Sequence, residues 1–302
     1  MLTGVCWYRI GAFACHPPQL YFVPCHKVRR KRNYYYYTRT TPAVLSFILG
    51  LFVVVFSVLV AVAGLVLVQR LVPATKRRRY NEVAGFIYAV LGVTYAVLLG
   101  LVVIAVWDRF AEARNTADRE ASELAEVFWL AHQLPEPEGP HIQEQARSYA
   151  EVVVNEEWPL MKEGQASPHA WELLDELRMA VEDSSQIDTG TEEMLYQQEL
   201  QRIHDLADAR RSRLLDADIG IPAVLWAVLV AGGVIVVGFT YLFGMDNFLV
   251  HALMVAAVAG VIALALFTIG TLDYPFGSGV QVGPDAFELI LERFESSSLS
   301  DL

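Results

Sequence analysis

Two adjacent carboxylates, Glu156 and Glu157, are the residues in this chain whose types best fit acid–base chemistry. Neighbouring side chains on a helix point about 100° apart, so this pair cannot share a proton as a catalytic dyad. We expect one carboxylate to face solvent and the other to meet an arginine. The chain also lacks the spacing of a Ser/His/Asp triad, a phosphate-binding glycine loop and a cluster of metal ligands. These observations predict a protein that is not an enzyme and binds no metal or cofactor.

A charged cluster lies just before the third apolar run and consists of Asp208, Arg210, Arg211 and Arg213. One interpretation is a solvated surface, because charged side chains are mostly exposed. The other is a set of ion pairs with Glu120 or Glu123, which lie on an earlier predicted helix. Such pairs would join that helix to the end of the polar region. Candidate residues for coupling this region to the membrane are Trp107, Arg109, Arg210, Arg211 and Arg213.

A heptad is written twice between Gly85 and Leu98. It places Gly85 and Gly92 on one stripe of a helix, with Tyr88 and Tyr95 beside them. Small residues let helices approach closely in a membrane, and tyrosine hydroxyls add hydrogen bonds. One interpretation of the stripe is therefore a packing seam. The other is that copies of this helix surround an axis, so that the same four residues line a pore.

Four apolar runs without Lys, Arg, Asp or Glu are long enough to cross a hydrocarbon core of roughly 30 Å. They cover residues 43–68, 83–106, 223–243 and 248–272. A short turn joins the last two, which predicts an antiparallel hairpin. Apart from His251 the runs are poor in ionisable groups, which argues against coupled transport or proton pumping. The sequence therefore predicts an all-α membrane protein with four spans.

The second span continues into the polar region that follows it. A helical pattern runs past Trp107 to about Leu134, where prolines end it. Further helices are expected from Ile142 to Trp158 before Pro159, from Ser167-Pro168 to Glu182, and from Thr191 to Asp218. The last helix carries an apolar stripe of Leu200, Ile203, Ala207 and Leu214. No stretch shows a period of two, so an all-α soluble domain of four helices is predicted between spans two and three.

The chain therefore divides into five parts. These are a basic, disordered arm (1–42), membrane helices one and two (43–107), an acidic helical domain (108–218), membrane helices three and four (219–273), and a C-terminal segment with a short helix and a tail (274–302).

Charge is divided sharply along the chain. Residues 1–82 hold 12 Lys/Arg and one acid, whereas residues 108–218 hold 26 Asp/Glu and 10 Lys/Arg. An acidic domain does not attract phosphate backbones, so no nucleic-acid partner is expected. Bases near the spans are more numerous on the side that holds the arm, both flanks of the domain and the tail, so we expect that side to be cytoplasmic.

Several motifs, in this order, resemble a known family: Asn81-Glu82-x-x-Gly85, Gly92-x-x-Tyr95, Trp107, Glu157-Trp158-Pro159, Arg210-Arg211-x-Arg213, Pro222-x-x-x-Trp226 and Asp273-x-Pro275-Phe276-x-Gly279. They are similar to the bestrophin-like family of bacterial membrane proteins over about residues 43–294. The more distant true bestrophins carry a Pro-Phe-Gly after the fourth span, as Pro275-Phe276-Gly277 does here. In bestrophins an acidic calcium-binding run follows, whereas here the next residues are Ser278-Gly279-Val280-Gln281, so calcium binding is not carried over.

The resemblance implies a passive ion channel in the bacterial inner (plasma) membrane. Bestrophins are pentameric anion channels whose second membrane helix lines the pore and whose helical domain is cytosolic. Four spans enclose no pore alone, so a conducting form requires a homo-oligomer, with the lipid bilayer and ions as further partners. The alternative is a non-conducting sensor or scaffold whose soluble domain binds a partner protein.

Overall fold

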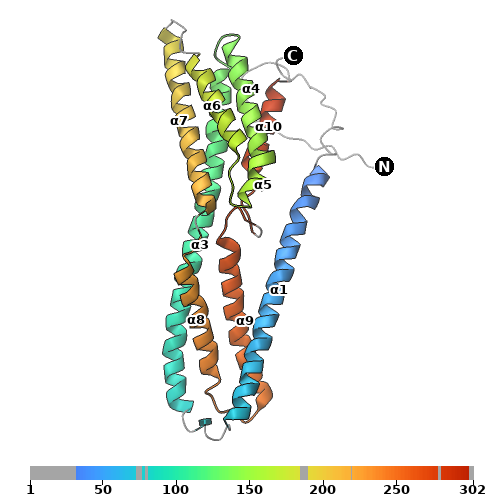
Figure 1. Ribbon diagram of the computed structural model, residues 1–302, viewed down its shortest axis with the longest axis vertical. Coiled ribbons are helices and arrows are strands. Elements are labelled where there is room, and N and C mark those ends of the chain that lie inside the picture. The colour runs from blue at the N-terminus through green and yellow to red at the C-terminus, as the bar shows by residue number, and fades with distance from the viewer. Residues whose placement is uncertain are drawn as a thin grey trace, which may run out of the picture. The chain divides into compact units, whose positions relative to one another are not determined.

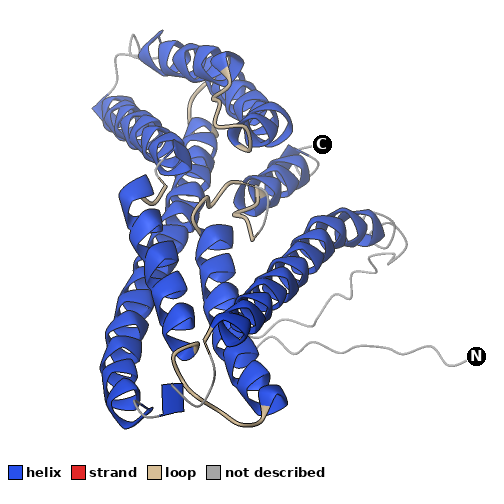
Figure 2. Cartoon of the chain, turned by 60° about the horizontal axis from the view of Figure 1, so that its bottom comes forward, coloured by secondary structure: helices blue, strands red, loops and turns tan. Residues whose placement is uncertain are grey.

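The computed structural model describes residues 32–72, 77–78, 81–183, 190–218, 220–277 and 280–298. The chain divides into two units after Thr41, and the account below concerns the second unit, Pro42–Leu302. The part of the chain that is described contains helices and connecting loops and no strand (Figure 2). The all-α fold predicted from the sequence is confirmed.

Among the described residues, four helices are long and apolar enough to cross a membrane. They are α1 (Arg32–Leu71), α3 (Asn81–Ala131), α8 (Ala223–Thr240) and α9 (Phe248–Leu272) (Figure 1). The apolar run in α1 begins at Ala43, and the helix itself begins earlier, at Arg32. Extending an existing helix is far easier than nucleating one, so the polar residues before the span join it. Residues 1–31 of the expected arm lie outside the described residues.

The helix α3 joins the membrane half of the protein to its polar domain without interruption. Its 51 residues correspond to a rod of roughly 75 Å at 1.5 Å per residue. The predicted continuation past Trp107 is therefore confirmed, with the end at Ala131 and not at Leu134. A cis-proline turn follows, and Gly139 then lies so close to the rod that an added Cβ would be 2.5 Å from the Ala131 carbonyl oxygen. Only glycine fits this close approach.

The polar domain is built from the upper part of α3 and from shorter helices. These are α4 (Glu138–Val152), the π-helix η1 (Val153–Glu157), α5 (Trp158–Met161), α6 (Pro168–Asp183) and α7 (Gly190–Asp218). The expectation that Pro159 stops the helix predicted from Ile142 to Trp158 was wrong. The Trp158 N–H bonds the Val153 carbonyl oxygen five residues back, and the chain then continues helically to Met161. Proline is tolerated in the first turn of this new α-segment because its missing N–H has no required partner there.

The start of α6 follows the expected capping pattern. The Ser167 hydroxyl accepts a hydrogen bond from the Ala170 backbone N–H, and Pro168 occupies the first helical position. Ser167 is fully buried. This cap fixes where α6 begins, and hence where the loop from α5 must end.

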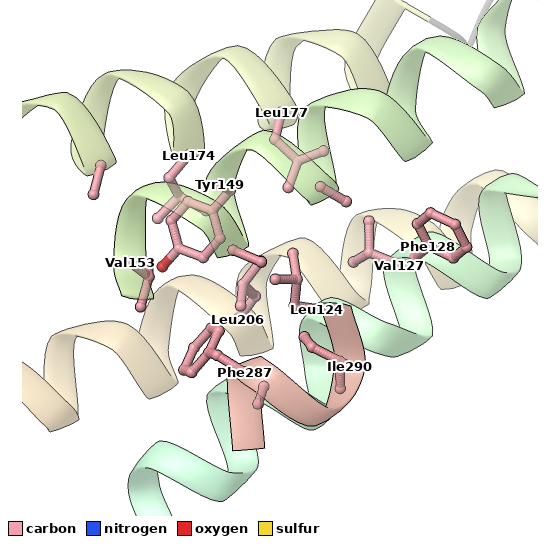
Figure 3. Packing of buried hydrophobic residues seen from close by; sticks show 14 of the residues in the cluster. Leu124, Val127, Phe128, Tyr149, Val153, Leu174, Leu177, Leu206, Phe287 and Ile290 are labelled. Atoms are coloured by element: carbon pink, nitrogen blue, oxygen red, sulfur yellow. The ribbon is translucent and has the colours of Figure 1, made fainter. Parts of the chain in front are cut away.

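One apolar core holds these helices together, and the C-terminal helix α10 (Asp285–Ser298) completes it (Figure 3). Phe287 and Phe294 of α10 are fully buried, and Phe294 stacks on Phe128 of α3 with 3.8 Å between ring centroids. Burying each large apolar side chain stabilises the fold by about 1.5–3 kcal/mol. The short C-terminal helix was predicted, but its place in the core was not.

The end of the membrane helices farthest from the domain is tied together by polar contacts. Asn81 exchanges two hydrogen bonds with Gly244, each at 3.0 Å, which joins the start of α3 to the α8–α9 turn. Arg77 donates to the carbonyl oxygens of Tyr241 and Phe243, where a cation complements the C-terminal end of α8. The turn between α8 and α9 is short, and the predicted hairpin is confirmed.

Candidate functional site

The doubled heptad places its tyrosines and glycines in different surroundings. The Tyr95 hydroxyl donates to the Leu229 carbonyl oxygen of α8 at 2.8 Å, and its ring lies against Gly232 and Gly233. An alanine at Gly232 would bring its Cβ within 2.6 Å of the Tyr95 ring. Within the chain, this tyrosine therefore holds α3 close to α8.

Tyr88 lies two turns before Tyr95 and contacts the same helix. Its ring packs against Phe239 and Phe243, with centroids 6.1 and 5.7 Å away. Gly92, by contrast, has no heavy atom within 4 Å of an added Cβ, and Gly85 has only the edge of Phe243 at 4.0 Å. The stripe thus has an aromatic side that contacts α8 and a glycine side that the chain itself leaves open.

A further face of the membrane part of α3 is also uncovered in the single chain, whereas Val102 and Val106 are buried against the other membrane helices. Val90, Val97 and Ile104 are each more than half exposed, and no atom lies within 4 Å of an added Cβ at Gly100. Trp107 is exposed and stacks on Phe110, and Arg109 is exposed next to it. A face this long and apolar needs lipid or a further protein chain to cover it.

A buried ion-pair network lies in the polar domain, close to where α3 leaves the membrane helices. Arg210 donates two hydrogen bonds to the Glu157 carboxylate, of 2.9 and 2.6 Å, and Arg213 donates to the same carboxylate at 2.7 Å. Arg213 also makes a bidentate pair with Glu120 of α3. All four side chains are fully buried. Two positive and two negative charges therefore balance inside the domain.

Aromatic groups surround this network and complete its hydrogen bonds. The Tyr149 hydroxyl donates to Glu120 at 2.6 Å and accepts from Arg210 at 3.0 Å. Arg210 lies over the Trp171 ring at 4.6 Å, and Arg213 lies over the Trp158 ring at 4.9 Å. Such cation–π contacts in a desolvated site add to the ion pairs.

The environment shifts the pKa values of these groups toward fixed charge states. Burial raises the pKa of Tyr149 well above its ordinary value, and the neighbouring charge of Glu120 raises it further. Burial alone would lower the pKa of Arg213, but the charges of Glu120 and Glu157 and the hydrogen bond to Glu120 outweigh it and raise that pKa. The Arg213 guanidinium therefore stays charged and the Tyr149 phenol stays neutral.

The two carboxylates singled out from the sequence are separated as expected. Glu157 meets both buried arginines, whereas Glu156 is partly exposed and contacts Ser167 and His169. Hydrogen bonds from Ser167 and His169 lower the pKa of Glu156 below its ordinary value. No proton is shared between the pair.

The second interpretation of the charged cluster, pairing with Glu120 or Glu123, is correct for Arg213 alone, because the buried Arg210 pairs with Glu157. Arg213 pairs with Glu120, and Glu123 pairs instead with Arg202 at 3.0 Å. Arg211 is exposed and pairs with Asp208 three residues earlier, so this part is a solvated surface. Residues 210 and 213 share a helix face that residue 211 does not share, which explains the division.

The C-terminal motif connects the last membrane helix to two other segments. Asp273 accepts the Ile221 backbone N–H at 2.7 Å and the Trp226 indole N–H at 3.1 Å, which joins the end of α9 to the start of α8. Phe276 is buried against Trp158, whose indole N–H donates to the Val282 carbonyl oxygen at 3.1 Å. Pro275 and Gly277 lie on either side of Phe276. The Pro275 carbonyl oxygen accepts the Val282 N–H, and the Gly277 N–H donates to the Tyr274 carbonyl oxygen. The motif therefore fastens the domain to the membrane helices.

Comparison with known proteins identifies the class to which this arrangement belongs. The chain matches the model of the bestrophin-like domain over residues 55–287. The protein belongs to the bestrophin-like family.

Solved structures share the fold at low sequence identity. A crystal structure of a bacterial bestrophin homologue from Klebsiella pneumoniae is 16% identical, with a TM-score of 0.57, and the match covers 80% of this chain and 96% of that one. A mutant of the same homologue gives 16% identity, a TM-score of 0.59 and coverage of 80% and 97%. No match was found among the curated proteins. These likenesses show the fold.

Proposed function

We propose that this protein is one subunit of a homo-oligomeric passive ion channel in which α3 lines the pore. The observation that carries the proposal is the uncovered face of α3. One side of this helix is fixed to α8 by Tyr95, while Val90, Val97 and Gly92 face away from the rest of the chain. Copies of the chain around an axis would cover the open side and enclose a path for ions. The family resemblance points the same way.

In this arrangement the glycine side and the aromatic side of the stripe have different roles. Gly85 and Gly92 would be the points where neighbouring subunits approach closely, because glycine leaves room for another backbone. Tyr88 and Tyr95 would set the distance between α3 and α8, and through it the width of the pore. The ion pairs of Arg210 and Arg213 would hold the other domain helices to the upper part of α3. Because α3 is one continuous helix, a movement of the domain would then be transmitted to its membrane part.

Planar-bilayer recording of the purified, reconstituted protein tests the function directly. We expect unitary currents that persist without a driving co-substrate, together with a detergent-solubilised ring of four or more subunits. A mock purification from cells without the protein is the control for contaminating channels. A monomer or dimer without currents would instead favour the non-conducting scaffold whose acidic domain binds a partner protein.

We further propose that the domain and both termini lie in the cytoplasm of a bacterial cell. The test is labelling of one introduced cysteine by a membrane-impermeant reagent, in a variant whose Cys6, Cys15 and Cys25 are replaced by serine. Ala166→Cys is a suitable site because Ala166 is exposed, whereas its neighbour Ser167 is buried and caps α6. Labelling only after cell lysis is expected, and labelling of intact cells would reverse the orientation.

A further inference from the structure

A cavity of about 390 Å³ lies where the polar domain meets the membrane helices. The turn after α5, residues 161–164, forms one wall, and the end of α9 at Gly270 and Thr271 forms another. Tyr274 contributes a third side, and its ring lies against Gly220 before α8. The cavity therefore touches both the soluble domain and the last turn of a membrane helix.

The depth of this cavity follows from the end of α9. This helix is apolar to Leu272, and the buried carboxylate of Asp273 follows at once. The hydrocarbon core of a bilayer must end near this change from apolar to charged residues, and lipid headgroups occupy the next layer. The cavity thus lies at the depth of the headgroups.

The lining carries charges of both signs that the domain does not use. Lys162 is the only lysine after residue 76, and its side chain is exposed, with no hydrogen bond or ion pair to any described residue. The side chain of Glu163 is likewise exposed and has no partner among the described residues. This contrasts with the network nearby, in which both glutamates are paired with arginines.

Two hydroxyl groups add complementary hydrogen-bonding capacity. The Thr271 hydroxyl donates to the Thr268 carbonyl oxygen at 2.9 Å, so its remaining lone pair is an acceptor. The Tyr274 hydroxyl has no protein acceptor among the described residues, so its proton is available. A cation and a phenol can bind a phosphate, while a carboxylate and a hydroxyl oxygen can bind an ammonium group.

We propose that this cavity binds a phosphate group that carries a primary ammonium group, as in the headgroup of phosphatidylethanolamine. Lys162 and Tyr274 bind the phosphate, and Glu163 and Thr271 accept hydrogen bonds from the ammonium. The position at headgroup depth makes a membrane lipid the source, and a soluble phosphoethanolamine has the same recognised chemistry. The site is independent of whether the protein conducts ions.

The test uses the reactivity of Lys162 in the full-length protein. The amine is acylated with a water-soluble N-hydroxysuccinimide ester, and peptide mass spectrometry gives its rate of modification relative to that of a lysine peptide added as an internal standard. The standard corrects for ester that the amines of phosphatidylethanolamine and phosphoethanolamine consume. The protein is compared in nanodiscs of phosphatidylethanolamine and of phosphatidylcholine, and in detergent with or without soluble phosphoethanolamine. We expect at least fivefold slower acylation in phosphatidylethanolamine than in phosphatidylcholine, because the quaternary amine of choline has no N–H to donate. Protection by soluble phosphoethanolamine equal to that by the lipid would assign the site to a soluble ligand.

A second readout is the amount of lipid that copurifies with the protein in mild detergent. Lys162→Gln and Glu163→Gln should each reduce bound phosphatidylethanolamine at least threefold, measured by native mass spectrometry. Arg114→Gln removes another exposed positive charge, from the lower part of the domain, and should retain the wild-type amount. Equal acylation rates in every lipid and buffer, or unchanged copurification in both cavity variants, would overturn the proposal. Both variants alter exposed residues, and an unchanged elution volume in size-exclusion chromatography confirms that they fold.

Discussion

Tyr95 of α3 donates its hydroxyl to the backbone carbonyl oxygen of Leu229 in α8, over 2.8 Å. This single contact connects the helix that carries the doubled heptad to the hairpin that follows the polar domain. The ring packs against two consecutive glycines, Gly232 and Gly233, so the two helix backbones lie close together. Large and small residues alternate across this interface, as is usual where membrane helices pack.

Removing the Tyr95 hydroxyl should weaken the contact between α3 and α8. Tyr95→Phe is expected to lower the free energy of unfolding by about 1 kcal/mol, because the Leu229 carbonyl loses its donor. Tyr88→Phe is the matched control, since Tyr88 contacts α8 only through ring packing. Thermal unfolding in detergent measures both. Equal destabilisation by the two variants would mean that the hydroxyl of Tyr95 contributes nothing specific.

The glycines of α3 and α8 should respond differently to larger side chains. Gly232→Ala places a Cβ against the Tyr95 ring, and such overpacking costs about 1–3 kcal/mol within the chain. The Cβ of Gly92→Leu has no heavy atom of a neighbouring helix within 4 Å, so we expect the monomer to keep its stability. We expect this variant to break the homo-oligomer, as measured by size-exclusion chromatography with light scattering. An oligomer of wild-type size would remove Gly92 from the subunit contact.

The buried arginines should be far more important for stability than their exposed neighbour. Arg210→Met leaves Glu157 without its bidentate partner in a buried site, at an expected cost of about 3–5 kcal/mol. Arg211→Met removes an exposed pair with Asp208, for which the expected change is about 0–1 kcal/mol. Urea unfolding followed by tryptophan fluorescence compares the two. Similar midpoints would show that the network does not stabilise the domain.

Glu199 should make the domain less stable as the pH rises. Its side chain is buried in α7, neither carboxylate oxygen has a hydrogen-bond partner among the described residues, and burial raises its pKa to about 8. The folded state therefore holds a proton that the unfolded state, with an ordinary pKa of 4.5, has lost. Stability falls as pH rises between these two values and is lowest above about 8.

Glu199→Gln should remove this pH dependence, because the amide carries no titrating proton. We expect the variant to exceed the wild type in stability at pH 8 by a few kcal/mol and to approach it near pH 5. Glu182→Gln changes an exposed carboxylate of α6 and should follow the wild-type profile. Melting temperatures across this pH range give the answer. A Glu199→Gln profile parallel to that of the wild type would place the proton elsewhere.

Breaking α3 between its membrane and polar halves should uncouple the two. A Gly-Pro insertion after Arg109 interrupts the helix where proline costs about 3 kcal/mol or more. We expect altered gating in bilayer recordings while both halves remain folded by circular dichroism. The same insertion after Ser185, between α6 and α7, is the control. Unchanged currents in the first variant would show that the continuous rod has no coupling role.

The apolar spans and the order of the domain helices could be predicted from the sequence. Runs of 20 or more apolar residues have no other stable place than a membrane, and prolines mark the ends of several helices. The separation of Glu156 from Glu157 also followed from helix geometry alone. These features depend on neighbours along the chain, which the sequence contains directly.

The burial of the ion-pair network was not predicted, because the buried face of α7 is rotated slightly from the apolar stripe that the sequence shows. Leu200 and Leu214 indicated the inner stripe of α7, but they are only half-buried, and the centre of that face holds Arg210 and Arg213. Charged residues are normally assigned to the surface, so the predicted buried face of the helix excludes these arginines. Their burial is stable because Glu120 and Glu157, far apart in sequence, arrive from two other helices. Pairing of the cluster with Glu120, and of one of the two adjacent carboxylates with an arginine, was indicated by the sequence, but the burial of all four charges together was not.

Because α10 supplies Phe287 and Phe294 to the core, the order of synthesis constrains when the domain can close. The ribosome makes the domain helices from α3 to α7, then both spans of the α8–α9 hairpin, and only afterwards the helix that finishes the core. Until then, the surface around Phe128 has no ring to stack against. A chain terminated before Asp285 would carry all four spans and yet present an apolar opening to chaperones and proteases. The last helix thus makes a complete chain a condition for a closed domain.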